Sequence, residues 1–233
     1  AADLGGRPLS RGAARARVTP LLAHLVRRIE AEGPIGVDTY MAEVLGHQEH
    51  GYYMTGDPLG RAGDFVTAPE VSQMFGELIG LWCAIVWTQM GSPPRAHLVE
   101  LGPGRGTLMA DALRAAAGVE GFLDALDVHL VETSPSLRER QRRNLSMVAP
   151  QLTWHGSARD IPSGPMIVIA NEFLDALPIR QIQRTSDGWR ERCIGMAEGK
   201  LVWTLGSAVP PPSVSAPVGG VVELAPVRES VVA

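Results

Sequence analysis

The stretch that decides the fold is HLVELGPGRGTL, His97 to Leu108. It reads as a buried apolar strand that runs directly into a glycine-rich turn and then into a helix that begins near Thr107. The glycines are Gly102, Gly104 and Gly106. A ligand that reaches the backbone N–H groups of a strand-to-helix turn needs glycine there, because a Cβ atom would hold it away. The stretch therefore predicts a ligand site at the first turn of an α/β fold.

Strands and helices alternate on the carboxyl side of this turn. Apolar runs predict strands at residues 96–102, 127–132, 152–155 and 166–170, and amphipathic spacing predicts helices at 107–117 and 135–148. Short apolar strands separated by helices are typical of a parallel sheet with right-handed crossovers. We predict a Rossmann-like α/β core.

The region before this core has a different pattern. Residues 1–17 read as a basic arm, and apolar spacing predicts a helix from Pro20 to Gly33-Pro34. Asp38 is expected to cap a short helix that ends at Leu45. A glycine- and proline-rich loop follows at 46–70, and a helix at 71–90 is apolar on almost all sides and should be buried.

The region after Pro178 predicts a small antiparallel meander. Alternating segments at 179–184, 189–196 and 200–205 are joined by Asp-Gly and Glu-Gly turns. Prolines then mark a linker, and residues 221–233 look like the start of a helix. The predicted domains are an N-terminal arm, helices and lid loop at 1–93, a ligand-binding α/β core at 94–178, a meander insertion at 179–206, and a linker with the start of a helix at 207–233.

Composition excludes several classes of protein. The 233 residues are 45% apolar with a formal charge of −4, which is sufficient for one large core and argues against a protein that coats nucleic acid. No apolar run is long enough for a membrane-spanning helix. Cys83 and Cys193 lie far apart without a CxxC motif, so neither a disulfide framework nor a structural zinc site is expected. A reducing compartment is the default expectation.

Two acids flank the glycine turn. Glu132 ends the second strand, where a carboxylate can accept hydrogen bonds from both hydroxyls of a ribose. Glu100 precedes the turn by two residues; it would repel a pyrophosphate but suits the sulfonium or amino group of S-adenosylmethionine. We therefore favour S-adenosylmethionine over a nicotinamide dinucleotide. A tight turn without a ligand is the remaining alternative.

The candidate catalytic residues follow the fourth predicted strand. Asn171 and Glu172 are expected near the switch point of the sheet, where reacting groups gather. Glu172 could hold a guanidinium bidentately or act as a base, and Asn171 could orient an NH or a carbonyl group. The alternative is that Asn171 and Asp175 cap the following turn.

The loop at 46–70 supplies a second set of candidates. Asp64 and Glu70 fit either a lid over the cofactor or a surface turn followed by a helix-start acid. His47 and His50, with the adjacent tyrosines, could line the same pocket; a third metal ligand at usable spacing is missing, so no metal is predicted. Arg105 could contact the cofactor carboxylate or be solvated.

Long motifs identify a family resemblance. The sequence resembles the MidA family of class I S-adenosylmethionine-dependent methyltransferases over nearly all of residues 32–178. The motifs that carry the resemblance are EGPIGVDTYM at 32–41, GYY at 51–53, GDFVTAPEVSQMFGELIG at 63–80, VELGPGRGTL at 99–108, LVETSPSLRERQ at 130–141 and ANEFLDALP at 170–178. Two departures stand out: Gln48 occupies a position usually held by proline, and further strands, including a segment like LFIDYG, are not present in this sequence.

The resemblance implies a function as well as a fold. Mitochondrial members of the family are complex I assembly factors that symmetrically dimethylate an arginine of a complex I subunit, so a protein substrate is implied. The implied location is the mitochondrial matrix in a eukaryote and the cytoplasm in a bacterium. The resemblance implies that S-adenosylmethionine binds at the glycine loop and Glu132. It also implies that Thr67 and Pro69 line the cofactor pocket, together with Asp64, Glu70, Asn171 and Glu172. A non-catalytic assembly factor and a small-molecule methyltransferase remain alternatives, and no oligomeric state follows from the sequence.

Overall fold

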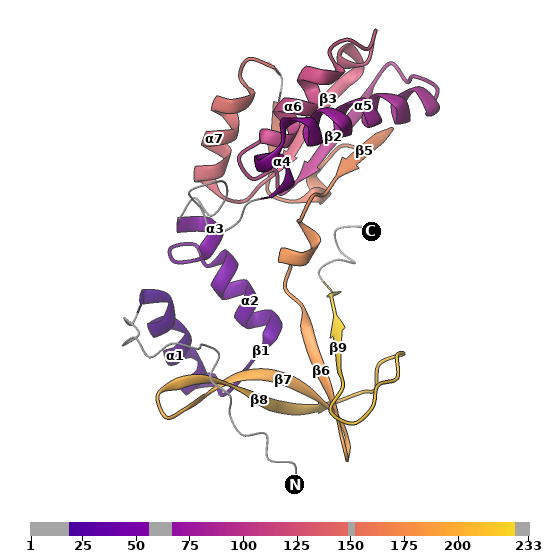
Figure 1. The fold of residues 1–233 in the computed structure, drawn as a ribbon. Coiled ribbons are helices and arrows are strands. Elements are labelled where there is room, and N and C mark those ends of the chain that lie inside the picture. Colours follow the sequence, from indigo (N-terminus) through magenta and orange to yellow (C-terminus); the bar gives the residue numbers. More distant parts are fainter. Residues whose placement is uncertain (1–18, 56–66, 149–151, 227–233) are drawn as a thin grey trace. The chain divides into compact units, whose positions relative to one another are not determined.

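The structure is a computed structural model that describes residues 19–55, 67–148 and 152–226. The chain forms two compact units, one from residues 1–55 and 176–233 and one from residues 56–175 (Figure 1). The predicted N-terminal arm and Asp64 lie outside the described residues. Within those residues, we find no helix with the length and apolar character that a membrane crossing requires.

A four-stranded parallel sheet forms the centre of the unit at 56–175. Its strands are β2 (Ala96–Leu101), β3 (Leu126–Val131), β4 (Leu152–His155) and β5 (Met166–Ile169). They lie in the order β4-β3-β2-β5. The prediction of four parallel strands is confirmed. Because β3 and β5 pair with opposite edges of β2, the strand order reverses at β2. In α/β folds, ligands bind in the crevice at the carboxyl ends of the strands beside such a reversal.

Helices cover one face of this sheet. They are α5 (Gln73–Gln89), α6 (Thr107–Ala116) and α7 (Pro135–Leu145). Short 3₁₀ turns elsewhere in the chain span Leu123–Ala125, Ala158–Asp160 and Leu174–Ala176. Alternate strand residues supply the core against them, namely Ala96, Leu98, Val128, Leu130, Ile167 and Ile169. Period-two alternation therefore places the intervening residues on the opposite face.

The helix predicted at 71–90 differs from the expectation in two ways. The structure has a short α4 (Ala68–Val71), an extended residue at Ser72, and then α5. The expected burial is also wrong on one side, because five large apolar side chains of α5 are 42–63% exposed: Met74, Leu78, Leu81, Trp82 and Ile85. Only the stripe that faces α6 and the sheet is buried. Several exposed large apolar side chains on one helix are typical of a surface that contacts other protein.

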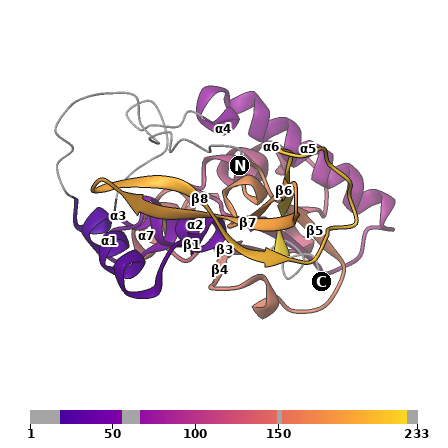
Figure 2. The same cartoon turned by 90° about the horizontal axis from the view of Figure 1, so that it is seen from below.

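Helices α5 and α6 lie side by side (Figure 2), and their close packing depends on a glycine. A Cβ atom on Gly80 would lie 2.2 Å from the carbonyl oxygen of Ala112 in α6. The two backbones therefore approach more closely than any side chain at this position would allow. Cys83 and Ala84 fill the adjacent interface and are fully buried.

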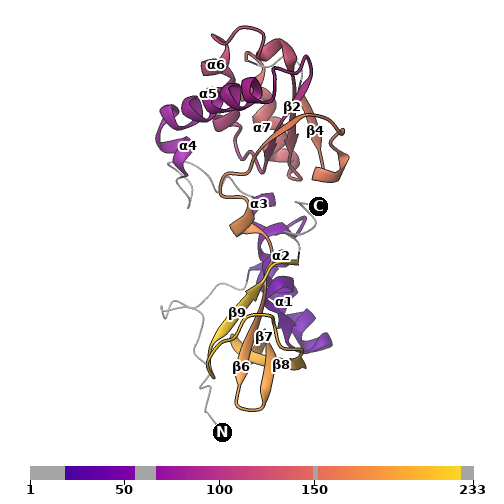
Figure 3. The same ribbon diagram turned by 90° about the vertical axis from the view of Figure 1, so that its right-hand side faces the viewer.

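The other unit combines helices with an antiparallel sheet (Figure 3). The helices are α1 (Pro20–Glu32), α2 (Val37–Gly46) and α3 (Tyr52–Thr55), and the strands are β1 (Ile35–Gly36), β6 (Arg180–Thr185), β7 (Gly188–Ala197), β8 (Lys200–Val209) and β9 (Val221–Leu224). The predicted helix from Pro20 is confirmed, because Thr19 caps α1 and Gly33 ends it. Strands β6, β7 and β8 confirm the predicted meander.

Two local expectations for this unit are wrong. The segment that begins at Val221 forms strand β9 and pairs with β6, not the start of a helix. Without β9, one edge of β6 would carry unpaired backbone N–H and C=O groups. The β-branched Val221 and Val222 also suit a strand better than a helix. Gly36, not Asp38, is the N-cap of α2. Asp38 lies in the first turn, where its carboxylate accepts a 2.7 Å hydrogen bond from the N–H of Thr39.

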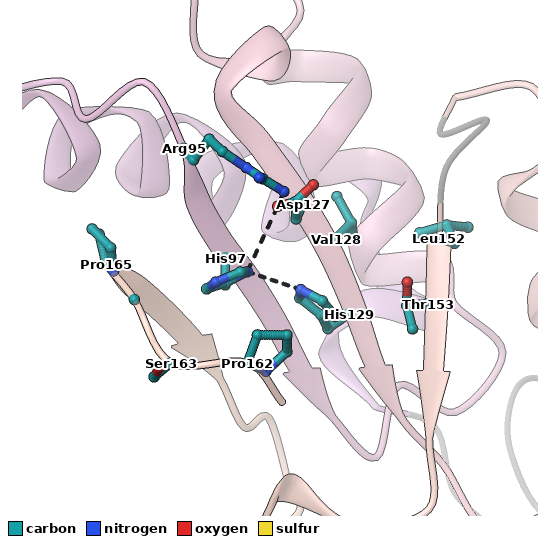
Figure 4. A pocket seen from close by; sticks show the side chains of 11 residues that line it. Arg95, His97, Asp127, Val128, His129, Leu152, Thr153, Pro162, Ser163 and Pro165 are labelled. Atoms are coloured by element: carbon teal, nitrogen blue, oxygen red, sulfur yellow. Dashed lines mark hydrogen bonds and ion pairs between the residues drawn. The ribbon is translucent and has the colours of Figure 1, made fainter. Parts of the chain in front are cut away.

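A row of three histidines crosses the sheet face opposite the helices. His97 Nδ1 lies 3.0 Å from His129 Nε2 (Figure 4). On the next strand, His129 Nδ1 lies 2.9 Å from His155 Nε2. Parallel sheets are usually apolar on both faces, so a polar row of this kind is unusual. Burial, together with the neighbouring imidazoles, lowers the pKa of His129. The neutral form of the central ring is therefore favoured.

We expect the Gly80→Ala substitution to destabilise the protein. The added methyl group must displace the backbone of α6, and overpacking of this kind costs about 1–3 kcal/mol. The measurement is the free energy of unfolding in urea. Gly118→Ala is the control, because a Cβ atom there meets no atom of the described residues within 4 Å, apart from its chain neighbours. A Gly80→Ala protein as stable as this control would contradict the packing described for α5 and α6.

We expect His129 to make the folded state less stable at acidic pH. Its pKa is lower in the folded chain than in the unfolded chain, so the unfolded state binds more protons as the pH falls through about 6.5. The free energy of unfolding, measured at a series of pH values between 8 and 5, should fall less steeply in a His129→Gln variant. An unchanged slope would show that His129 titrates normally in the folded protein.

Candidate functional site

The glycine loop lies between β2 and α6, at the carboxyl edge of the parallel sheet. Gly102, Gly104 and Gly106 have φ values of 62°, 55° and 80°, in the left-handed region that favours glycine. The N–H of Gly102 donates to the carbonyl of Val131 at 3.0 Å, which ties the loop to the end of β3. Gly106 begins α6 as its N-cap. The predicted strand, turn and helix are therefore all present.

Phe173 explains why Gly102 must lack a side chain. A Cβ atom on Gly102 would lie 2.6 Å from the Phe173 ring, which comes from the segment after β5. The glycine thus permits this aromatic side chain to approach the loop. Phe173 is not among the residues predicted from the sequence, although it lies between Glu172 and Leu174 in the motif at 170–178.

Glu132 follows β3 directly and is almost fully buried. Its Oε1 accepts a hydrogen bond from the N–H of Ser134 at 2.8 Å, and its Oε2 accepts one from Gln141 Nε2 at 3.3 Å. Burial raises the pKa of Glu132, and the hydrogen bonds from Ser134, Thr133 and Gln141 oppose that rise. These donors hold the carboxyl group in one orientation at the position expected for a ribose-binding acid.

Glu100 lies in β2, two residues before the loop, and is 3% exposed. Its Oε2 is buried and has no hydrogen-bond partner among the described residues. Burial raises the pKa of Glu100 to about 8, so the group is mostly neutral at pH 7. A buried carboxyl oxygen without a partner is costly. Glu100 is therefore the side chain in this region with an unsatisfied need for a donor or a cation.

Glu70 connects α4 to the glycine loop. Its Oε1 accepts a 2.7 Å hydrogen bond from the Thr107 hydroxyl, and its Oε2 lies 3.3 Å from Arg105 Nη1. Thr67 is the N-cap of α4 and Pro69 is buried in its first turn. The structure thus brings Glu70 to the loop, where it holds Arg105 and the first residue of α6.

Asn171 and Glu172 follow β5 at the same edge of the sheet. Asn171 is half-buried, whereas Glu172 and Asp175 are exposed. Glu172 has a φ of 49°, a left-handed conformation that costs a residue with a Cβ atom about 1–2 kcal/mol. Such strain is concentrated at functional sites. Both predicted residues therefore lie at the carboxyl end of β5, and Glu172 is in an unusual backbone conformation.

His47 lies in the other unit, near two further potential metal ligands. The ligand atoms of His24, Glu43 and His47 all lie within 4.8 Å of one another. Arg28 forms an ion pair with Glu43, and His47 Nδ1 accepts backbone hydrogen bonds from Glu49 and His50. These contacts link α1 to α2 and order the turn after α2. They engage Glu43 Oε1 and His47 Nδ1, whereas His24 Nε2 has no hydrogen-bond partner among the described residues. Sequence spacing did not indicate a third ligand, but the structure brings His24 and Glu43 to His47.

A cavity of about 550 Å³ lies at the amino-terminal edge of the parallel sheet. Arg95, His97, Asp127, His129, Thr153 and Ser163 are among the residues that line it (Figure 4). Arg95 forms an ion pair with Asp127 at 2.9 Å. Because the strands are parallel, this edge is opposite the one that carries the glycine loop. The cavity is therefore separate from the candidate site.

Ser134, Gln141 and Trp154 belong to the site but were not selected from the sequence. Ser134 caps α7 and donates to Glu132, and Gln141 is completely buried. A signal for Gln141 was present, because it lies at the i+4 position between Leu137 and Leu145 on the buried stripe of an otherwise charged helix. A polar residue on such a stripe indicates a buried hydrogen-bond partner.

Comparisons with known proteins identify relatives. Residues 78–221 match the model of a family described as "Putative S-adenosyl-L-methionine-dependent methyltransferase". "Protein arginine methyltransferase NDUFAF7, mitochondrial" from Xenopus laevis is 43% identical over 218 residues, which is 83% of this chain and 50% of the relative. The human protein of the same name is 41% identical over 196 residues, which is 75% of this chain and 44% of the relative.

A solved structure has the same fold. A protein from Burkholderia thailandensis, crystallised with S-adenosyl-homocysteine, superposes with a TM-score of 0.73 at 30% identity and covers 88% of this chain and 56% of its own. The chain spans about half the length of the curated relatives that it matches. The matched family model covers most of the chain, including the glycine loop and the segment after β5. This chain therefore belongs to that family of S-adenosyl-L-methionine-dependent methyltransferases.

Proposed function

We propose that this protein binds S-adenosylmethionine and transfers its methyl group to an arginine of a protein substrate. The observation that carries the proposal is a pair of buried carboxyl groups, Glu100 and Glu132, on either side of a left-handed glycine loop. A ligand that fits this arrangement carries a positive charge and two adjacent hydroxyl groups, as S-adenosylmethionine does.

The residues of the site fit the cofactor in two places. Glu132 is oriented by Ser134 and Gln141, and its remaining lone pairs can accept hydrogen bonds from the ribose hydroxyls. Glu100 has a buried oxygen that no described residue hydrogen-bonds, and a cationic group of the cofactor would satisfy it. When bound, the cofactor supplies an electrophilic methyl group on a sulfonium.

A dinucleotide fits the same loop less well. Arg105, the cation carried by the loop itself, is already paired with Glu70. A pyrophosphate would therefore meet a neutralised arginine beside Glu70, Glu100 and Glu132. Three carboxyl groups around one loop favour a cationic ligand over an anionic one.

Glu172 is the proposed catalytic residue for the acceptor. Its exposed carboxylate, at the carboxyl end of β5, can bind a guanidinium through two hydrogen bonds, while Asn171 orients the same group. In the transfer, the sulfur–methyl bond breaks as a nitrogen–methyl bond forms, and the acceptor nitrogen loses one proton to Glu172 or to water. Asp64, Glu70, Thr67 and Pro69 remain proposed pocket residues; of these, the structure brings Glu70 to the loop.

The relatives support the class of acceptor. Two relatives carry the name protein arginine methyltransferase and the word mitochondrial. We propose by analogy that the acceptor is a protein arginine, that it belongs to a complex I subunit as the MidA resemblance implies, and that a eukaryotic form acts in mitochondria.

We expect cofactor binding to release a proton from Glu100. The free group is protonated below about pH 8, and a nearby cation favours its ionised form. Calorimetric titration with S-adenosylmethionine at pH 7, in buffers of different ionisation enthalpy, should show the release of up to one proton. The release should disappear near pH 9 and in a Glu100→Gln variant. Equal release in that variant would assign the proton to another group.

We expect Glu172→Gln to abolish methyl transfer while cofactor binding persists. The substitution removes the charge that holds the guanidinium and the base that accepts its proton. Glu198→Gln is a matched control, because Glu198 is also an exposed glutamate with a φ of 50°. Transfer is measured by mass spectrometry of complex I subunits incubated with the protein and S-adenosylmethionine.

The outcomes separate the candidate functions. Arginine methylation by the unmodified protein and by Glu198→Gln, but not by Glu172→Gln, is the expected result. Cofactor binding without methylation of any subunit would favour the non-catalytic assembly factor. Binding of NAD in preference to S-adenosylmethionine or S-adenosyl-homocysteine would overturn the proposal.

A further inference from the structure

Gln141 is a polar side chain in an apolar position. Helix α7 buries Leu137, Gln141 and Leu145, which follow one another at intervals of four residues, and Gln141 is 0% exposed. The rest of the helix is rich in arginine and solvated. A buried amide is retained at low cost only when its donor and acceptor groups are all satisfied. Its partners therefore show what this residue does.

Each end of the Gln141 amide has a partner at the candidate site. Trp154 Nε1 donates to Gln141 Oε1 at 2.8 Å, and Gln141 Nε2 donates to the carbonyl of Gly104 at 2.8 Å and to Glu132 Oε2 at 3.3 Å. An indole N–H can only donate a hydrogen bond, so it fixes which end of the amide carries the oxygen. The NH₂ group must then face the two acceptors. The amide is thus held in one orientation.

This amide joins the two halves of the proposed cofactor site. One of its N–H groups holds the ribose-binding carboxyl group, whose other oxygen is held by the N–H of Ser134. The second N–H holds the middle of the glycine loop. Because a peptide group is planar, fixing the Gly104 carbonyl toward α7 directs the next N–H to the opposite side of the loop. The loop and Glu132 are therefore positioned by the same side chain.

A second amide on α7 makes a similar contact without burial. Asn144 Nδ2 donates to the carbonyl of Arg105 at 2.9 Å, one residue further along the loop. Asn144 is exposed, so water can replace its hydrogen bond when the side chain is lost. Nothing can replace the contacts of Gln141 in the same way. The two residues thus form a matched pair, one buried and one exposed, on the same loop.

We propose that Gln141, oriented by Trp154, is a positioning residue that preforms the cofactor site. It sets the glycine loop and Glu132 in their binding geometry before the ligand arrives. This inference rests on the proposed function, because it assumes that the loop and Glu132 bind S-adenosylmethionine. It adds a residue that has no direct contact with the reacting atoms.

The first test compares isosteric substitutions at the two positions. Gln141→Met and Asn144→Leu remove the hydrogen bonds while keeping the approximate size of each side chain. The dissociation constant for S-adenosyl-homocysteine, measured by calorimetry, should rise about tenfold or more in Gln141→Met and change less than about threefold in Asn144→Leu. Unfolding in urea is measured for both variants, so that folded protein is compared with folded protein.

The second test uses pH to separate positioning from general destabilisation. Gln141→Glu keeps the contact with Trp154 but places a carboxyl group against Glu132. Near pH 7 it should bind S-adenosyl-homocysteine weakly. Toward pH 5.5 its affinity, relative to that of the unmodified protein, should recover, because one shared proton restores a donor between the two acids. Gln141→Met has no such proton and should show no recovery.

Each result has a defined meaning. No binding of S-adenosyl-homocysteine by the unmodified protein would overturn the proposed function itself. Binding by the unmodified protein with equal affinity in Gln141→Met would overturn only the positioning role, even if that variant is less stable. If Gln141→Met does not fold, Trp154→Phe replaces it, because this change removes the indole donor that fixes the amide and keeps an aromatic ring at that position. Unchanged affinity in folded Trp154→Phe would likewise overturn the role.

Discussion

One buried amide, that of Gln141, is shared by the glycine loop, the end of β3 and Trp154 in β4. Its position depends on α7, which begins at Ser134 and packs through Leu137 and Leu145. Residues from three successive segments must therefore reach their places before the loop acquires its geometry. The geometry of the ligand site therefore depends on the assembled parallel sheet and α7, and not on the loop alone.

Burial of carboxyl groups gives this site its chemical character. Glu100 lies in the core with an oxygen that has no hydrogen-bond partner in the described part of the chain, and its pKa is raised to about 8. Such a group destabilises the free protein and favours a ligand that brings positive charge. Glu70 neutralises Arg105 on the other side of the loop. The electrostatic preference of the site thus comes from the buried carboxyl group of Glu100 and from the pairing of Arg105 with Glu70, more than from the net charge of the chain.

Local signals predicted much of the fold and much of the candidate site. The strands of the core, the helix from Pro20 and the meander were predicted because hydrophobic periodicity, caps and turn residues act over a few positions. Periodicity did not predict that one apolar face of α5 is exposed, because it cannot show which neighbour covers a helix. Strand β9 was not predicted, because its partner β6 lies about forty residues earlier in the sequence and the pairing depends on a free sheet edge.

The sequence by itself determined the parallel α/β core, the glycine loop and the acids expected on either side of it. These features depend on backbone sterics and on residue order, which are local. Only the tertiary structure decided that Glu70 pairs with Arg105, that Phe173 packs on Gly102, and that Gln141 spans the loop and Glu132. The reason is physical: a hydrogen bond between distant segments depends on how helices and strands pack, and packing is fixed only when the whole core is assembled.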